Sequence, residues 1–184
     1  MAQLIYAAIT SADGYIADRD GQFDWAQPDA EVHAAVNDLL RPAGTYLYGR
    51  RMFEVMRGWD DPSFAQGAPE VIADFSRLWR AADMIVYSST LEAAGTGRTL
   101  LERHFDADAV RELKETAHAD LAIGGAGLAA EAFTAGLVDE VHLFPAPVSV
   151  GGGTAAMPSF RVDLELVGLR RFASGFAYLH YRVR

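Results

Sequence analysis

The alternation of short apolar runs with amphipathic stretches is the feature that most constrains the fold of this chain. Leu4–Thr10 is a nearly continuous apolar run followed by the turn signal Asp13-Gly14, which is typical of a strand buried on both faces. Shorter runs of the same kind occupy residues 45–48, 84–87, 121–123 and 140–144. Strands separated by helices predict an α/β fold with a mostly parallel sheet.

The stretches between these runs predict the helices. The first begins after Asp29, a good N-cap residue, and carries Val32, Val36, Leu39 and Leu40 at helical spacing. Further helices are predicted after Gly49, over residues 71–79, after Asp106 as an N-cap, and from the glycine-rich turn at 124–127 to about residue 135.

The C-terminal end follows a different period. Residues 162–166 and 179–183 alternate between apolar and polar, and Ser174-Gly175 lies between them, which predicts an antiparallel hairpin. The predicted fold is therefore three-layered, with a mixed, mostly parallel sheet, helices on both faces and a C-terminal hairpin. There is no internal repeat or linker, so residues 1–184 are expected to form a single domain.

Composition and charge exclude several classes of function. The formal net charge is −9, which argues against nucleic acid or an anionic membrane as a partner. The chain has no cysteine, which excludes disulfides, zinc-thiolate sites and cysteine catalysis. The five histidines include no close pair of the H-x-x-x-H kind, so no metal site is predicted. The apolar start is too short for a signal peptide, and a cytoplasmic location is expected.

Polar or glycine-rich segments follow the predicted strands, where open α/β sheets bind their ligands. In Gly49-Arg50-Arg51, the glycine allows close approach to the backbone and the arginines offer charge-assisted donors to phosphate; the alternative is a solvated basic pair. The hydroxyls of Ser88-Ser89-Thr90 are suited to phosphate, or simply form a polar turn. The remaining segments are Ser11-Ala12-Asp13-Gly14 and Gly124-Gly125-Ala126-Gly127-Leu128.

Residues 125–130 match the G-x-G-x-x-G/A dinucleotide fingerprint. However, Asp139 and Glu140 precede the next strand, whereas the fingerprint needs an acid at its end, so a Rossmann domain is disfavoured. We expect a glycine turn that contacts a cofactor, with tight helix–strand packing as the alternative.

Three acids near the first helix are candidates for supplying or relaying a proton: Asp24, Asp29 and Glu31. The structural alternative is a helix cap for Asp29 and a first-turn acid facing the helix dipole for Glu31. Trp25 is a candidate wall of a ligand pocket, or a core residue.

In combination, these segments resemble the bacterial dihydrofolate-reductase-like family, which includes the reductase domain of the bifunctional riboflavin-biosynthesis deaminase/reductase. Residues 11–17 are similar to its S-L-D-G-x-I-A opening, residues 47–54 to L-x-G-R-x-T-x-E, and residues 86–91 to V-x-S-x-T-L. Residues 124–128 resemble its G-G-x-x-L turn, and residues 136–153 resemble G-L-V-D-E-x…P-V-x-x-G-G-G.

The resemblance implies NADPH as the hydride donor. Its phosphates would lie near Arg50, Arg51 and Ser88 to Thr90, with further contacts at Gly124 to Leu128. Ala8, Asp13, Trp25 and the following helix would line the substrate side. The resemblance also implies a cis peptide bond between Gly124 and Gly125.

Departures from the family pattern limit the choice of substrate. Met52 stands where the family has a threonine, and Tyr15 and Ile123 replace residues typical of the riboflavin-pathway reductases. The expected function is NADPH-dependent reduction of a small conjugated heterocycle, pteridine-like or pyrimidine-like. The alternative is a non-catalytic nucleotide- or ligand-binding protein on the same fold. A homodimer is expected because two-fold dimers are the commonest oligomers.

Overall fold

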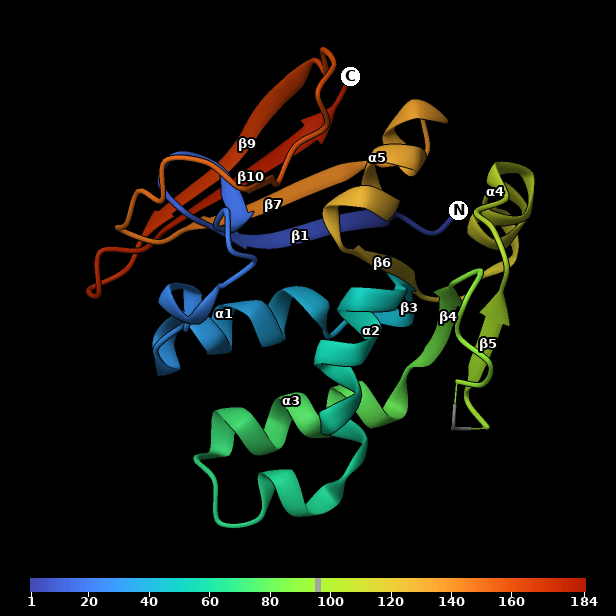
Figure 1. Ribbon diagram of the computed structural model, residues 1–184, viewed down its shortest axis with the longest axis horizontal. Helices are drawn as coiled ribbons and strands as arrows, with labels where there is room; N and C mark the ends of the chain where they lie inside the picture. Colours follow the sequence, from blue (N-terminus) through green and yellow to red (C-terminus); the bar gives the residue numbers. More distant parts are fainter. Residues whose placement is uncertain (95–96) are drawn as a thin grey trace.

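The central element of the molecule is an eight-stranded sheet with the strand order β5-β4-β3-β6-β1-β7-β10-β9 (Figure 1). The computed structural model describes residues 1–94 and 97–184. Adjacent strands from β5 to β7 pair in parallel. These strands are β1 (Leu4–Thr10), β3 (Ala43–Gly49), β4 (Asp83–Tyr87), β5 (Thr99–Glu102), β6 (Asp120–Gly124) and β7 (Glu140–Pro145).

The C-terminal hairpin completes the sheet in antiparallel fashion. It consists of β9 (Leu164–Arg171) and β10 (Ala177–Val183), and β10 also pairs with β7. The predicted hairpin is therefore confirmed. Two very short strands, β2 (Tyr15–Ala17) and β8 (Thr154–Ala155), form a separate sheet. These two strands and the half-exposed edge strand β5 were not predicted, because none of them carries a clear apolar run.

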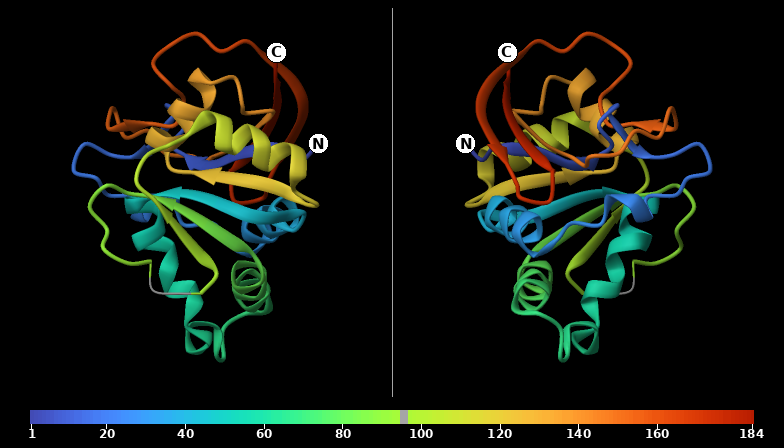
Figure 2. Two further views of the ribbon diagram at one scale, coloured as in Figure 1. Left: turned by 90° about the vertical axis from the view of Figure 1, so that its right-hand side faces the viewer. Right: turned by 90° about the vertical axis from the view of Figure 1, so that its left-hand side faces the viewer.

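Helices cover both faces of the sheet, as predicted (Figures 1 and 2). One face carries α1 (Ala30–Leu40), α2 (Arg50–Met56) and α3 (Glu70–Ala81), whereas α4 (Ala107–Thr116) and α5 (Ala126–Thr134) cover the other. Short 3-10 helices occupy Asp24–Ala26, Arg57–Asp60 and Pro62–Ala65. No helix in the described part of the chain combines the length and apolarity needed to cross a membrane.

The alternation of side chains along β3 divides the core between the two faces. Leu47 packs in the cluster beneath α4 and α5. Tyr46 and Tyr48 point to the other side and stack with Trp79 of α3, at ring-centroid distances of 5.8 and 5.7 Å. This aromatic stack anchors α3 below the strands that carry the candidate site.

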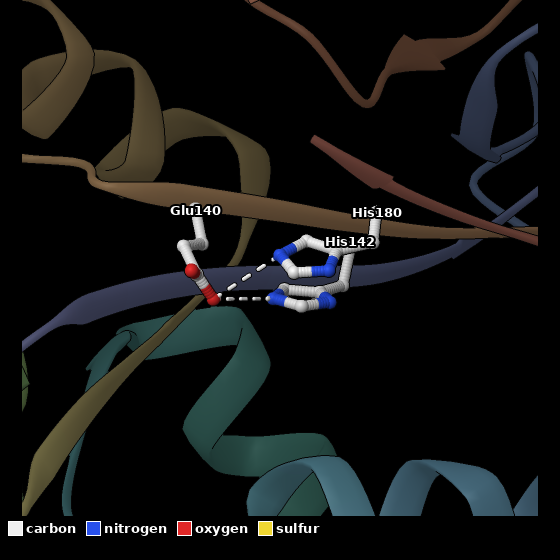
Figure 3. A group of neighbouring side chains, drawn as sticks. All are labelled: Glu140, His142 and His180. Atoms are coloured by element: carbon white, nitrogen blue, oxygen red, sulfur yellow. Dashed lines mark hydrogen bonds and ion pairs between the residues drawn. The ribbon is translucent and has the colours of Figure 1, made fainter. Parts of the chain in front are cut away.

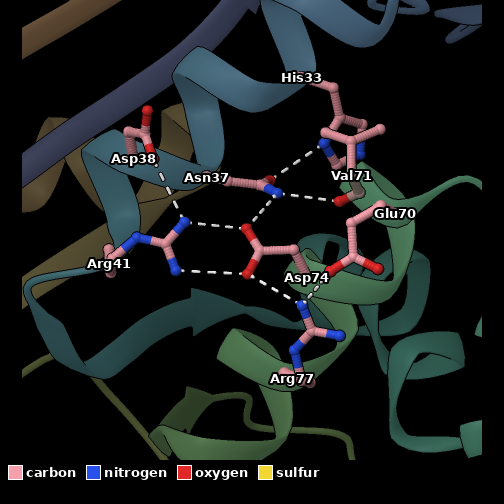
Figure 4. Close-up of polar contacts among 8 residues, drawn as sticks. All are labelled: His33, Asn37, Asp38, Arg41, Glu70, Val71, Asp74 and Arg77. Carbon is pink, nitrogen blue, oxygen red and sulfur yellow. Dashed lines mark hydrogen bonds and ion pairs between the residues drawn. The ribbon is translucent and has the colours of Figure 1, made fainter.

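A polar network joins α1 to α3 (Figure 4). The buried Asn37 donates from Nδ2 to the carbonyl of Val71 at 2.9 Å and to Asp74 Oδ2 at 3.0 Å, and its Oδ1 lies 3.0 Å from His33 Nδ1. Arg41 forms two hydrogen bonds to the same carboxylate of Asp74. The network satisfies the buried amide and fixes the spacing of the two helices.

Candidate functional site

The parallel strands bring three predicted cofactor segments to one edge of the sheet. Gly49 at the end of β3 is the register partner of Tyr87 at the end of β4, and Tyr48 is the partner of Gly124 at the end of β6. The loops that follow these strands are therefore neighbours, as expected for the carboxyl edge of an open sheet.

The two arginines after β3 have different surroundings. Arg50 donates from Nε to Glu54 Oε1 and from Nη1 to Thr90 Oγ1, both at 2.8 Å. Arg51 is exposed and has no side-chain partner among the residues that the structure describes. Arg50 is thus held in place, whereas the guanidinium of Arg51 is available to an anion.

The serine-threonine segment after β4 is partly occupied by its own turn. The Oγ atom of the buried Ser88 accepts hydrogen bonds from the amides of Thr90 (3.3 Å) and Leu91 (3.0 Å). Ser88 therefore forms the polar turn that was the structural alternative at this position. Ser89 and Thr90 are exposed, so their hydroxyls are the ones presented to solvent.

Two helices that begin at this edge start without a side-chain cap. For comparison, the helices α1 and α4 do have side-chain caps: Asp29 and Asp106 accept hydrogen bonds from their first amides, as predicted. In contrast, α2 begins after Gly49 and α5 after Gly125, and neither glycine can provide such a bond. The first amides of α5 are therefore free to bind an anion such as phosphate.

The glycine turn adopts a conformation different from the one expected. The described residues contain no cis peptide bond, so the predicted cis bond between Gly124 and Gly125 is wrong. Gly125 instead has a trans peptide and a φ of +91°, a conformation that a side chain would disfavour.

The remaining residues of the turn serve different purposes. A Cβ atom on Gly124 would lie 2.3 Å from the ring of Tyr48, so this glycine is required by packing. Leu128 is buried in the core beneath α5. Gly127 is exposed, and a Cβ there would meet no atom within 4 Å. The backbone of Gly125, Ala126 and Gly127 is thus the part of the turn that is left for a ligand.

The side chain of Asp13 links two loops by hydrogen bonds. Its carboxylate accepts hydrogen bonds from the amides of Val150 (3.1 Å) and Gly151 (2.7 Å). The hydroxyl of Ser11, together with these amides, holds the pKa of Asp13 far below its usual range. The partnership links the loop before β2 to the three-glycine loop before β8, and the sequence motifs had indicated both loops without pairing them.

Each of the three candidate acids has an identifiable position. Asp24 is exposed on the first 3-10 helix. Asp29 caps α1, and hydrogen bonds from the Ser174 hydroxyl and the capped amides lower its pKa. Glu31 pairs with Arg170 at 2.6 Å. Asp29 therefore has the structural role considered for it, and its lowered pKa is the opposite of the raised value expected of a proton donor.

The predicted substrate residues lie on two faces of the sheet. Trp25 packs against a buried cluster that includes Val32 of α1 and Phe144 of β7, and Ile9 packs against the same cluster. Ala8 belongs to the cluster on the α4–α5 side. The structure therefore does not bring Ala8 and Trp25 together. Ile9 is the β1 residue on the Trp25 side, and strand alternation is the signal that could have identified it.

A hollow of about 440 Å³ lies beside the Arg50–Glu54 ion pair. Its lining comes from α2, the 3-10 helix that follows it, and the segment after β4. The lining residues are Phe53, Glu54, Val55, Arg57, Gly58, Asp60, Ala93 and Ala94.

Comparison with known proteins identifies the family. The model of the RibD C-terminal domain matches residues 2–178. The uncharacterized protein YyaP of Bacillus subtilis (strain 168) is 26% identical over 182 residues, which cover 97% of this chain and 94% of YyaP.

Solved structures share the fold at low sequence identity. A protein from Shewanella sp. PV-4 assigned to riboflavin biosynthesis superposes with a TM-score of 0.77 and 20% identity, covering 100% of this chain and 99% of that one. Dihydrofolate reductase from Enterococcus faecalis, complexed with NADP(H) and RAB-propyl, gives a TM-score of 0.66 and 16% identity, with 99% and 96% coverage. The fold is thus dihydrofolate-reductase-like.

Proposed function

Because the chain belongs to the RibD C-terminal domain family, we propose that it is an NADPH-dependent reductase of a small conjugated heterocycle of the pyrimidine or pteridine type. The hydrogen bond between Arg50 and Thr90 carries this proposal, because it joins two loops that the family resemblance assigns to one cofactor. The uncapped start of α5 lies after the neighbouring strand of the same edge.

These residues suit the phosphates of a dinucleotide. Arg51, with Ser89 and Thr90, would hold the 2′-phosphate, and Arg50 would orient this group of donors. The free amides after Gly125 would hold the pyrophosphate at the positive end of α5. When bound, NADPH supplies the hydride.

The substrate would lie on the α1 side of the sheet, between Ile9, Trp25 and the loop that Asp13 fastens. These residues would position the heterocycle and exclude water from it. Among the three acids, Glu31 is the proposed donor or relay of the proton. Asp29 is less suited, because its lowered pKa keeps the carboxylate charged, and Asp24 lies outside α1, on the 3-10 helix before it.

The second candidate function is non-catalytic binding of a nucleotide on the same fold. Two observations favour it: Met52 lacks the hydroxyl of the family threonine, and Asp29 and Glu31 are engaged in a helix cap and an ion pair. Fold alone does not decide between the two functions.

The experiment that tests the proposal measures NADPH and NADH binding by calorimetry. It then follows the loss of NADPH absorbance with a panel of dihydropteridines and oxidised aminopyrimidines. Tight binding of NADPH and turnover of at least one heterocycle are expected. Binding without turnover across the panel would favour the second candidate, and no binding of NADPH would contradict the proposed reductase.

We further propose a homodimer located in the cytoplasm, with a small heterocyclic substrate and with neither nucleic acid nor a membrane as a partner. The edge strand β9 exposes Leu166, Val167 and Leu169, and such apolar exposure suits the contact between two copies.

A further inference from the structure

Three potential metal ligands from β7 and β10 converge on the α1 side of the sheet (Figure 3). His142 and His180 are directly opposite each other in the antiparallel pair. Glu140 precedes His142 by two residues and therefore points to the same face. No sequence pattern indicated this group, because its two histidines are far apart along the chain and meet only through strand pairing.

The three side chains are arranged around one carboxylate oxygen. Glu140 Oε2 lies 3.2 Å from His142 Nε2 and 3.3 Å from His180 Nε2. The two imidazole rings stack at a centroid distance of 4.2 Å. We propose that Glu140, His142 and His180 bind a divalent zinc ion, with water as the fourth ligand.

The spacing of the donor atoms fits this ion. Ligands of tetrahedral zinc lie ~2.0–2.2 Å from the metal, which places neighbouring donor atoms ~3.3 Å apart. Both measured distances from Glu140 Oε2 agree with that value. The rings are nearly parallel, at 19°, so a tilt of each about its Cβ–Cγ bond would direct both lone pairs at the ion.

The hydrogen bonding of the group leaves room for a cation. The Nε2 atom of His180 is buried, and its 3.3 Å contact with Glu140 Oε2 does not have the geometry of a hydrogen bond. The Nδ1 atom of His142 lies 2.8 Å from the hydroxyl of Tyr178. If His142 Nδ1 carries the proton and donates a hydrogen bond to that hydroxyl, His142 Nε2 presents its lone pair to the ion. Metal-bound histidines are usually oriented by a hydrogen bond of this kind from the other ring nitrogen.

The surrounding charges also allow an ion to bind. Arg182 is opposite Glu140 across the strands, but its guanidinium pairs with Glu165 at 3.8 Å. In the described part of the chain, Glu140 has ion pairs with the two histidines alone. The side chains of Glu140 and His180 are 25% and 19% exposed, so solvent reaches the group and can provide the fourth ligand.

The zinc site would be separate from the proposed cofactor site, and it shares the α1 face of the sheet with Ile9 and Trp25 of the proposed substrate side. Glu140 begins β7, whereas the cofactor segments follow the far ends of the parallel strands. At ~3.3 Å per residue, the length of β7 separates the two by ~16 Å. An ion here would link β7 to β10 and thereby hold the C-terminal hairpin on the parallel sheet.

The test is zinc binding by the untagged full chain, measured by calorimetry and by metal analysis after dialysis. One zinc ion per chain is expected, with a rise in melting temperature on zinc addition. Loss of a residue that hydrogen-bonds a metal ligand weakens metal binding by ~10–100-fold, so Tyr178→Phe should fall within that range. Glu140→Gln and His180→Gln each remove a ligand itself and should weaken zinc binding by more than ~100-fold. His118→Gln, which changes an exposed histidine on another part of the surface, is the matched control and should bind as the parent does.

The variants must fold for the comparison to be valid, so circular dichroism without zinc accompanies each titration. Cobalt substitution gives a second readout: the parent should show visible absorption of a tetrahedral site, and His180→Gln should lose it. Absence of zinc binding by the parent, or equal affinity in the parent and in both ligand variants, would overturn the proposal. The three residues would then be a hydrogen-bonded cluster only.

Discussion

Arg50 and Thr90 are 40 positions apart in the sequence, yet Arg50 Nη1 donates a hydrogen bond of 2.8 Å to Thr90 Oγ1. The contact arises because β3 and β4 are adjacent parallel strands whose ends are in register at Gly49 and Tyr87. With Arg50 engaged by Thr90 and Glu54, Arg51 is the neighbouring cation that can turn to a ligand.

Arg51→Ala is predicted to reduce the preference for NADPH over NADH. A charge-assisted hydrogen bond contributes ~1.5–3 kcal/mol, so NADPH should bind roughly 10–150-fold more weakly, whereas NADH binding should change little. Calorimetric titration of both nucleotides measures the effect, with Arg111→Ala on α4 as the control. Equal affinity of the parent chain for the two nucleotides would contradict this prediction.

Alanine substitutions at Gly125 and Gly127 of the α5 turn are predicted to differ in their effects on stability and on NADPH binding. Gly125→Ala forces a side chain into φ +91° and should lower the free energy of unfolding by ~1–3 kcal/mol. Gly127→Ala meets no atom and should leave that energy unchanged or raise it by up to ~1 kcal/mol. If the pyrophosphate approaches this backbone, Gly127→Ala should nevertheless weaken NADPH binding. Urea denaturation and nucleotide titration of both variants decide the matter, and unchanged NADPH affinity in Gly127→Ala would exclude close approach there.

The sequence predicted the elements that depend on local periodicity. The main strands, the helices, the caps Asp29 and Asp106 and the terminal hairpin are all present. Strand β5 escaped prediction because an edge strand with alternate exposure has no apolar run. The turn at Gly125 was assigned the wrong peptide geometry, because the cis bond was implied by the family resemblance, and the glycines themselves do not specify the dihedral angles of the turn.

The parts of the site that depend on tertiary contacts were less predictable. The loops at the carboxyl edge follow from strand order, so Gly49, Arg50 and Thr90 were correctly grouped. Ala8 was expected on the same substrate side as Trp25, but a residue on a strand covered on both faces points to one layer or the other, and here Ile9 shares the face of Trp25. The Glu140–His142–His180 group was invisible for a similar reason, because only the register of β7 and β10 brings its histidines together.

Lys114, the single lysine of the chain, is predicted to be essential for stability. Its buried Nζ atom donates to the carbonyl of Leu137 at 2.7 Å and pairs with Asp139 Oδ2 at 2.6 Å. That carboxylate also accepts from the amide of Leu4. Removal of one partner from a buried ion pair costs ~3–5 kcal/mol, and because Asp139 is partly exposed, Lys114→Met should lose about 3 kcal/mol. Urea denaturation measures this loss, and a change no larger than that of Arg111→Ala would show that solvent replaces the pair.

Asp74 is predicted to make the stability of the α1–α3 contact dependent on pH. Hydrogen bonds from Arg41, and then from Asn37, hold the pKa of Asp74 below its usual value. In the unfolded chain the Asp74 carboxyl has a pKa of ~3.9, so on acidification it takes up a proton before the folded chain does. The contribution of Asp74 to the free energy of unfolding is therefore complete above that pH and is lost as the pH falls through the folded pKa. In Asp74→Asn, the free energy of unfolding should be lower at neutral pH and should decline less on acidification. Asp108→Asn, at an exposed position, is the control, and parallel pH profiles for the parent chain and Asp74→Asn would contradict the prediction.

The last prediction concerns the proton that must accompany the hydride. Reduction of a C=N bond needs both, and Glu31 is the proposed donor or relay. Its carboxylate is paired with Arg170 at 2.6 Å and lies 3.4 Å from the amide of Ala173, so a substrate that engages Arg170 would free it for proton transfer. Glu31→Gln should slow the chemical step by ~10²–10⁴-fold, the usual range for general acid catalysis. NADPH affinity should hardly change, because the cofactor segments follow other strands.

The other two acids provide the comparison for Glu31. Asp29→Asn should keep most of the cap and the chemistry, because asparagine is also a good N-cap residue, and Asp24→Asn should have no effect on either. Single-turnover rates with an active heterocycle, measured for all three variants, separate a role in proton transfer from a role in folding. If Glu31→Gln turns over as fast as Asp24→Asn, water delivers the proton and Glu31 serves only to pair α1 with Arg170 of β9.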